Sequence, residues 1–93
     1  MTPEKHVDPS REQAEMLAIG ALSFLAAEPE ALTRFLRLTG LDPERLRDAA
    51  AEPGFLAGLL DYLLANEALL VDYARDAGIA PEAIARARAA LDT

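Results

Sequence analysis

The sequence predicts an all-α fold, a compact bundle of five to six short helices built from two similar three-helix units. Leucine and alanine supply most of an apolar fraction of 52% in 93 residues, and both favour helices. The β-branched residues are scattered, so no alternating run of them predicts a strand. We expect residues 1–8 to form a flexible N-terminal tail and residues 9–93 to form a single helical domain.

The first helix is expected over residues 10–27. Ser10 and Gln13 have the spacing of a capping box, in which each side chain bonds the other residue's backbone N–H. The pattern of apolar residues predicts a core face formed by Leu17, Ala21, Phe24 and Leu25. Glu28 precedes a proline, and a residue in that position disfavours the helical conformation, so the helix should end there.

The second and third helices complete the first half. Residues 29–39 begin with a proline, which suits a first helical turn, and they end before Gly40. Residues 43–52 also begin with a proline, and Asp42 stands where an N-cap is expected. The glycine between them is predicted to end its helix in the left-handed conformation, with a positive φ.

Three more helices are expected in the second half. Residues 53–65 are apolar around more than half of the helix circumference, which indicates a central helix contacted on several sides. Residues 67–77 follow Asn66, a candidate N-cap, and end before Gly78, for which a positive φ is again expected. Residues 81–91 begin with a proline and form the last helix.

The second half of the chain resembles the first. Residues 21–50 match residues 59–88 when they are displaced by 37 or 38 positions, and Gly40 then meets Gly78. The matched positions include Phe24 with Tyr62, Phe35 with Tyr73, Arg37 with Arg75, and Pro43 with Pro81. Shared helix punctuation, with glycine to stop and proline to restart, is the alternative explanation. We favour a duplication, in which two units too small to fold alone share one core.

Charge and composition narrow the classes of function. The formal charge of −7 and a pI near 4.5 repel the phosphates of nucleic acids and anionic membrane surfaces, so neither is an expected partner. Cysteine is absent, which excludes thiolate chemistry. Residues 55–71 are the longest apolar stretch, but polar residues interrupt it, and we expect a buried helix there rather than a membrane span. A cytoplasmic protein fits this composition.

No group of residues predicts catalysis. His6 is the single histidine and has no partner one helical turn away. Asp61, Glu67 and Asp72 could suggest a carboxylate site, but their positions on two successive helices favour solvated faces. We therefore predict that the protein is not an enzyme and has no catalytic, cofactor-binding or metal site.

Two segments carry a resemblance to a known family. The sequences FLRLTGLDP at residues 35–43 and DYLLANEALL at residues 61–70 resemble those of a small alphaproteobacterial family catalogued as domain of unknown function 3572. The resemblance covers roughly residues 14–91. It implies a cytoplasmic setting but no activity, and it transfers no functional residue.

The first helix carries the candidate interaction surface. Met16, Ile19 and Ala26 lie away from the expected core face, where large apolar side chains would contribute nothing to stability. Either several neighbours surround this helix, or this strip docks a partner. The strip predicts a protein partner or self-association through the first helix.

We therefore expect a non-enzymatic protein–protein interaction module, which docks an apolar helix face or the groove between the repeats onto a partner helix. The alternative is a small apolar ligand bound in a pocket between the repeats, lined by Phe24, Tyr62 or Tyr73. An enclosed cavity would favour the ligand, whereas a solid core with an exposed apolar patch would favour the interaction module.

Overall fold

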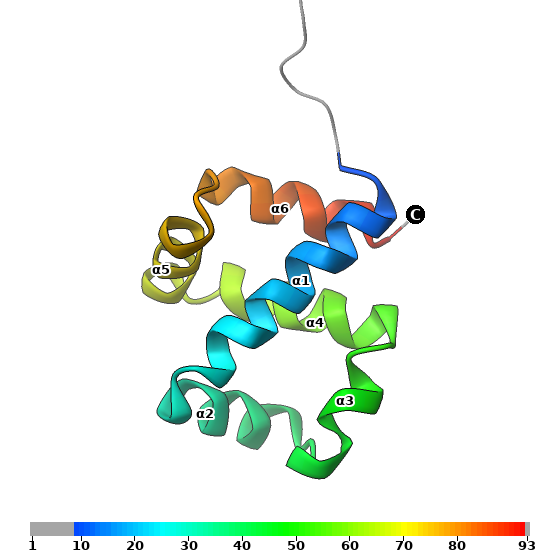
Figure 1. Ribbon diagram of the computed structural model, residues 1–93, viewed down its shortest axis with the longest axis vertical. Coiled ribbons are helices and arrows are strands. Elements are labelled where there is room, and N and C mark those ends of the chain that lie inside the picture. Colours follow the sequence, from blue (N-terminus) through cyan, green and yellow to red (C-terminus); the bar gives the residue numbers. More distant parts are fainter. Residues whose placement is uncertain (1–8, 93) are drawn as a thin grey trace, which may run out of the picture.

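The computed structural model describes residues 9–92, which form six α-helices and one short 3₁₀ helix, η1 (Figure 1). In chain order the elements are α1 (Arg11–Ala26), α2 (Pro29–Thr39), η1 (Pro43–Arg45), α3 (Leu46–Ala49), α4 (Pro53–Leu64), α5 (Glu67–Ala77) and α6 (Pro81–Ala90). The predicted all-α fold is confirmed, although the expected third helix is divided into η1 and α3. The tail predicted at residues 1–8 lies outside the described residues.

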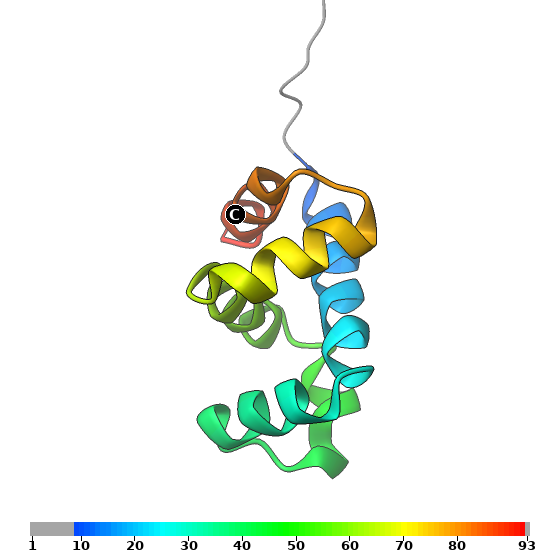
Figure 2. The ribbon, with the colours of Figure 1, turned by 90° about the vertical axis from the view of Figure 1, so that its left-hand side faces the viewer.

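The core lies where α1, α4 and α6 pack against one another. Figure 1 shows α1 running diagonally across α4, with α6 beside both helices, and Figure 2 shows α2, η1 and α3 at the opposite end of the molecule from α6. The buried side chains of α4 and α6 are Leu56, Leu59, Leu60, Leu63, Ile84 and Ala87. The prediction that the fourth helix is central is therefore correct.

The core face of α1 differs from the predicted one. Its buried residues are Ala14, Ala18, Ala21 and Leu25. Leu17 and Phe24, which were expected to point inward, are half-buried and lie on the flank of α1 that contacts α5. Alanine side chains are short, so they allow close approach of α1 to both α4 and α6, and the larger side chains take the flank where more room remains.

Aromatic rings attach α2 and α5 to this core. The Phe35 ring of α2 lies between two rings of α4, with centroid distances of 5.8 Å to Phe55 and 5.1 Å to Tyr62. The Phe24 ring of α1 lies 5.4 Å from the Tyr73 ring of α5. These tilted and edge-to-face arrangements are favourable for aromatic pairs. The rings therefore connect α2 to α4 and α5 to α1.

Of the three predicted N-caps, the one that begins α1 is confirmed, and the other two make no capping hydrogen bond. The capping box of α1 is formed, with bonds of 3.0 Å from the Gln13 N–H to the Ser10 hydroxyl and 2.9 Å from the Ser10 N–H to the Gln13 side chain. Asn66 occupies the N-cap of α5, but its amide donates to the Tyr62 carbonyl at 2.9 Å and so serves the end of α4. The Asp42 side chain makes no capping bond.

Both helix-terminating glycines have the predicted left-handed backbone, with φ of 71° at Gly40 and 70° at Gly78. In each case the residue after the glycine donates its N–H to the carbonyl five residues earlier, at 3.2 Å and 2.9 Å respectively. This bond is the signature of the Schellman motif, and it pairs a carbonyl that the helix end would otherwise leave without a donor.

A duplication of the whole three-helix unit is not shown by the structure. The first two helices of the two halves are bent by similar angles, 116° between α1 and α2 and 109° between α4 and α5. The third elements differ. After Gly40 the chain forms η1 and the four-residue α3, which contain no buried residue. After Gly78 it forms the ten-residue α6, which packs on α1 and α4. The origin of the chain by duplication stays a prediction.

Replacing Gly78 with valine should destabilise the protein by about 1–3 kcal/mol, because a β-branched residue is strained in the left-handed region. Gly58 is the matched control, since it lies inside α4 with ordinary backbone angles and open space around an added Cβ. Gly58→Ala should be neutral or stabilising by up to about 1 kcal/mol. Thermal unfolding followed by circular dichroism measures both changes. Unchanged melting of Gly78→Val would contradict the role assigned to this glycine.

Candidate interaction surface

The outer face of α1 carries an exposed apolar strip, which we define as Met16, Ile19 and Ala26. The side chain of Met16 is 68% exposed and that of Ile19 is 45% exposed, while Ala26 is also exposed. At 3.6 residues per turn Met16 lies opposite the buried alanines of the same helix, and Ile19 and Ala26 lie to one side of that direction. The three predicted residues are thus exposed, although several neighbours, α2, α4, α5 and α6, do contact other parts of α1.

The strip borders a groove between α1 and the η1–α3 segment, which we call the α1–α3 groove. Its volume is about 610 Å³. It is lined by Leu22, Ser23, Ala26, Pro43, Glu44, Leu46, Arg47 and Asp48. Ala26 belongs to both the strip and the groove, so the groove adjoins the C-terminal end of the strip. The charged residues of this groove all come from the η1–α3 side.

The wall of the α1–α3 groove is weakly attached to the rest of the protein. None of the residues from 36 to 55 is buried, although the chain in this range includes the end of α2, η1, α3 and the start of α4. Segments with few buried apolar contacts open at a lower free energy than the core does. The groove is thus formed by one rigid side, α1, and one adaptable side.

A second groove lies on the other flank of α1, and we call it the acidic groove. Its volume is about 530 Å³, and it is lined by Phe24, Glu28, Ala31, Leu69, Asp72, Arg75 and Asp76. Of the three aromatic residues that we expected around a ligand pocket, Phe24 lines this groove. The other two serve in packing, because the Tyr62 ring contacts Phe35 and the Tyr73 ring contacts Phe24 from within the protein.

Tyr73 connects α5 to α1 by a hydrogen bond. Its side chain is 5% exposed, and its hydroxyl donates to the Leu17 carbonyl at 2.8 Å. Gly20 makes this approach possible, since a Cβ at that position would lie 2.6 Å from the hydroxyl oxygen. Burial, and to a lesser extent the charge of Asp76, raises the pKa of Tyr73 above its ordinary value. The phenol therefore stays protonated and keeps its role as a donor.

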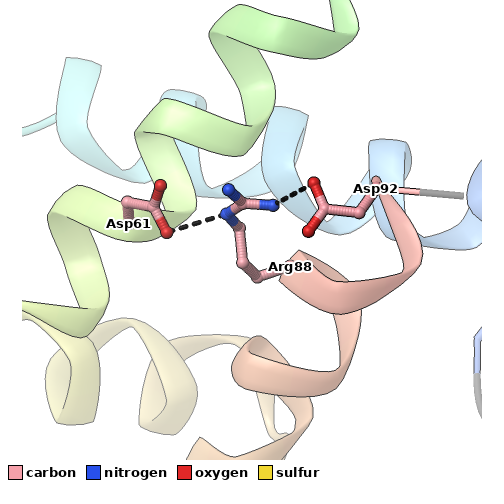
Figure 3. A network of polar contacts seen from close by, with 3 residues as sticks. All are labelled: Asp61, Arg88 and Asp92. Atoms are coloured by element: carbon pink, nitrogen blue, oxygen red, sulfur yellow. Dashed lines mark hydrogen bonds and ion pairs between the residues drawn. The ribbon is translucent and has the colours of Figure 1, made fainter.

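The carboxylates considered for catalysis are not brought together. Asp61 accepts a hydrogen bond of 2.7 Å from Arg88 of α6, which also donates to Asp92 at 2.8 Å (Figure 3). These two hydrogen bonds raise the pKa of Arg88 above its ordinary value. Asp72 lies 3.7 Å from Arg75 on its own helix. Within residues 9–92 no three histidine, cysteine or carboxylate side chains form a group that could hold a metal ion. His6 lies outside the described residues.

No single helix among the described residues has both the length and the apolar character needed to cross a membrane. Two pairs, α1 with α2 and α4 with α5, meet those criteria by length and composition when they are joined, but each pair is sharply bent.

Comparison with known proteins gives one match. The model of a family described as a protein of unknown function (DUF3572) matches residues 11–93. Neither a curated protein nor a solved structure matches the chain.

Replacing Gly20 with alanine should destabilise the protein by about 1–3 kcal/mol, the range typical of an overpacked contact, because the new methyl group collides with the Tyr73 hydroxyl. Tyr73→Phe removes that oxygen, so the double variant should lose less stability than the two single losses predict together. Urea unfolding of the four proteins measures this coupling. Additive losses would show that the two residues do not meet.

Stability should fall at alkaline pH because of Tyr73. Its pKa is raised in the folded state above the 10.0 of an unburied tyrosine, so the folded protein binds this proton more tightly than the unfolded chain does. The resulting stabilisation is complete below pH 10 and is lost as the pH rises through the folded-state pKa. Tyr73→Phe should therefore show a shallower loss of melting temperature above pH 10 than the unchanged protein. Parallel curves would contradict this assignment.

Proposed function

We propose that this chain, which belongs to the DUF3572 family, is a non-enzymatic protein–protein interaction module of the cytoplasm. In this proposal the apolar strip on α1 receives an amphipathic helix of another protein, and the α1–α3 groove receives the side chains along one edge of that helix. Such helix-in-groove recognition uses apolar side chains spaced three and four residues apart.

The observation that carries the proposal is the exposure of Met16 and Ile19 on a helix whose opposite face is fully packed. Burial of a large apolar side chain stabilises a protein by about 1.5–3 kcal/mol. A domain of 93 residues has little apolar surface to spare for this purpose. A contiguous exposed apolar patch is typical of an interaction surface, whereas single exposed apolar residues need no such explanation.

The α1–α3 groove supports a helical partner because its two sides have different properties. α1 provides a straight, rigid apolar edge through Leu22 and Ala26. The η1–α3 side contributes Leu46 from a segment without buried residues, so it can adjust its distance from α1 at low cost. The rim carries the two carboxylates of Glu44 and Asp48 and the guanidinium of Arg47. A partner helix with basic residues beside its apolar face would complement this rim.

The partner in this proposal is a different protein rather than a second copy. Each copy carries a formal charge of −7, so two copies repel one another as they approach. The same charge disfavours nucleic acids and anionic lipid surfaces. The alternative function, binding of a small apolar ligand in a pocket between the repeats, has weaker support, because the groove that Phe24 lines is open and has four charged residues around it.

Ile19→Asp should leave the fold intact and weaken partner binding. A photo-cross-linking residue at position 16 should capture a protein in cells, and the Ile19→Asp change should reduce that product by at least about tenfold, since a charge in an apolar interface costs more than 1.4 kcal/mol. Leu38→Asp is the control, because Leu38 is an exposed apolar residue on α2, outside the strip, with 68% exposure against 45% for Ile19. Circular dichroism monitors folding.

Three results would contradict the proposal. Unfolding of Ile19→Asp would show that Ile19 stabilises the protein by itself. Equal loss of product in Leu38→Asp would show that cross-linking does not depend on the strip. A concentration-dependent dimer in light scattering, abolished by Ile19→Asp, would identify the partner as a second copy.

A further inference from the structure

The acidic groove combines an apolar floor with an acidic rim. Its floor is formed by Phe24, Ala31 and Leu69, which come from α1, α2 and α5 and are all half-buried. The Phe24 ring is supported from within the protein by the Tyr73 ring at 5.4 Å. Because the hydroxyl of Tyr73 is bonded to the α1 backbone, this support is fixed, and the floor of the groove is preformed.

The rim of this groove has an excess of negative charge. Three of its side chains are carboxylates and one is a guanidinium, and the guanidinium of Arg75 lies 3.7 Å from the Asp72 carboxylate. Glu28 and Asp76 form no ion pair with any residue in the described range 9–92. The negative charge of Asp76 also contributes to the raised pKa of the neighbouring Tyr73, so this charge acts on a buried side chain. Two carboxylates without an ion-pair partner in that range, those of Glu28 and Asp76, therefore line the same groove as the Phe24 ring.

We propose that the acidic groove is a second docking site, which binds an arginine side chain presented by a basic segment of another protein. The aliphatic stem of the arginine lies on Leu69 and Ala31, and its guanidinium contacts the Phe24 ring and the carboxylates of Glu28 and Asp76. Long basic side chains bury their stems on apolar surface and keep the charge at the edge. A planar guanidinium also stacks on aromatic rings and donates to two carboxylates at once.

This site is separate from the apolar strip of the proposed function. Phe24 lies on the α5 flank of α1, whereas Ile19 and Ala26 lie on its outer face and toward η1 and α3. The two surfaces also differ in chemistry, because the strip is uncharged and the acidic groove depends on charge. One module could therefore hold two partners, or two segments of one partner, at the same time.

The occupant is another protein rather than a second copy of this chain. Arg34 and Arg37 on α2 have no ion pair within residues 9–92 and could in principle enter the groove of a neighbouring copy. Such a head-to-tail contact would produce a closed ring or an open filament of copies. Like charges of −7 on the two copies oppose it.

Fluorescence anisotropy with a defined probe tests the site. The probe is a labelled, flexible peptide of glycine, serine and arginine, which lacks the apolar helix face that the apolar strip is proposed to bind, and its companions carry lysine or glutamate in place of arginine. We expect the arginine peptide to bind most tightly, the lysine peptide more weakly and the glutamate peptide not at all. Added salt should weaken binding, because the contacts are partly exposed ion pairs. Failure of the arginine peptide to bind at millimolar concentration would overturn the proposal.

Matched double variants locate the site. Glu28→Gln with Asp76→Asn should raise the Kd of the arginine peptide by at least about tenfold, since both charged hydrogen bonds become weaker neutral ones. Glu44→Gln with Asp48→Asn removes the same charge from the α1–α3 groove, and it should change the Kd by less than about twofold. Equal effects of the two double variants would show nonspecific attraction and would overturn the proposal.

Two further variants separate this site from the proposed function. Phe24→Leu keeps an apolar floor but removes the aromatic ring, so it should weaken the arginine peptide more than the lysine peptide. Ile19→Asp should leave the arginine peptide bound as before, whatever it does to the partner of the apolar strip. If Ile19→Asp abolishes peptide binding, the peptide occupies the strip, and the acidic groove is not its site. Chemical-shift changes confined to Ala31, Leu69 and Asp76 would support the assigned position.

Discussion

Close packing of the alanine face of α1 against α4 and α6 is the constraint on which the other features depend. Ala14, Ala18 and Ala21 leave no exposed surface, so the axis of α1 lies near both neighbouring helices. This orientation turns Met16 and Ile19 outward and places Leu17 and Phe24 on the α5 flank. The candidate strip and the acidic groove thus follow from one orientation of one helix. An α1 with leucines in place of these alanines would stand farther from the core.

The contact between Gly20 and Tyr73 extends the same principle to α5. A residue without a side chain lets the tyrosine hydroxyl reach a carbonyl of α1, and this contact holds the ring that supports Phe24. Glycine inside a helix costs about 0.5–1 kcal/mol relative to alanine, so its presence at position 20 is explained by the contact that it permits. The arrangement links the stability of α5 to the shape of the acidic groove.

Much of the fold could be predicted from the sequence because the residues that start and end its helices act on their immediate neighbours. Proline at helix starts and glycine at helix ends act within a few residues, and the helix boundaries and the positive φ of Gly40 and Gly78 followed from them.

The core face of α1 could not be predicted by counting large apolar residues. The spacing of Ala14, Ala18 and Ala21 was its available signal, and Gly20 within a helix was a second. The Asp61–Arg88 contact joins residues 27 positions apart, and no local sequence pattern predicts it. Both grooves likewise depend on tertiary packing.

The segment without buried residues also affects the entropy of the chain. Residues 36–55 form most of the connection between α1 and α4, which must meet before a core exists. Closing a longer connection costs little, about 0.6 kcal/mol for each doubling of its length. Insertions or deletions between α2 and α4 would therefore change the free energy of core formation only slightly. A change in the length of this connection would also change the reach of the groove wall, while α1, α4 and α6 keep the same core.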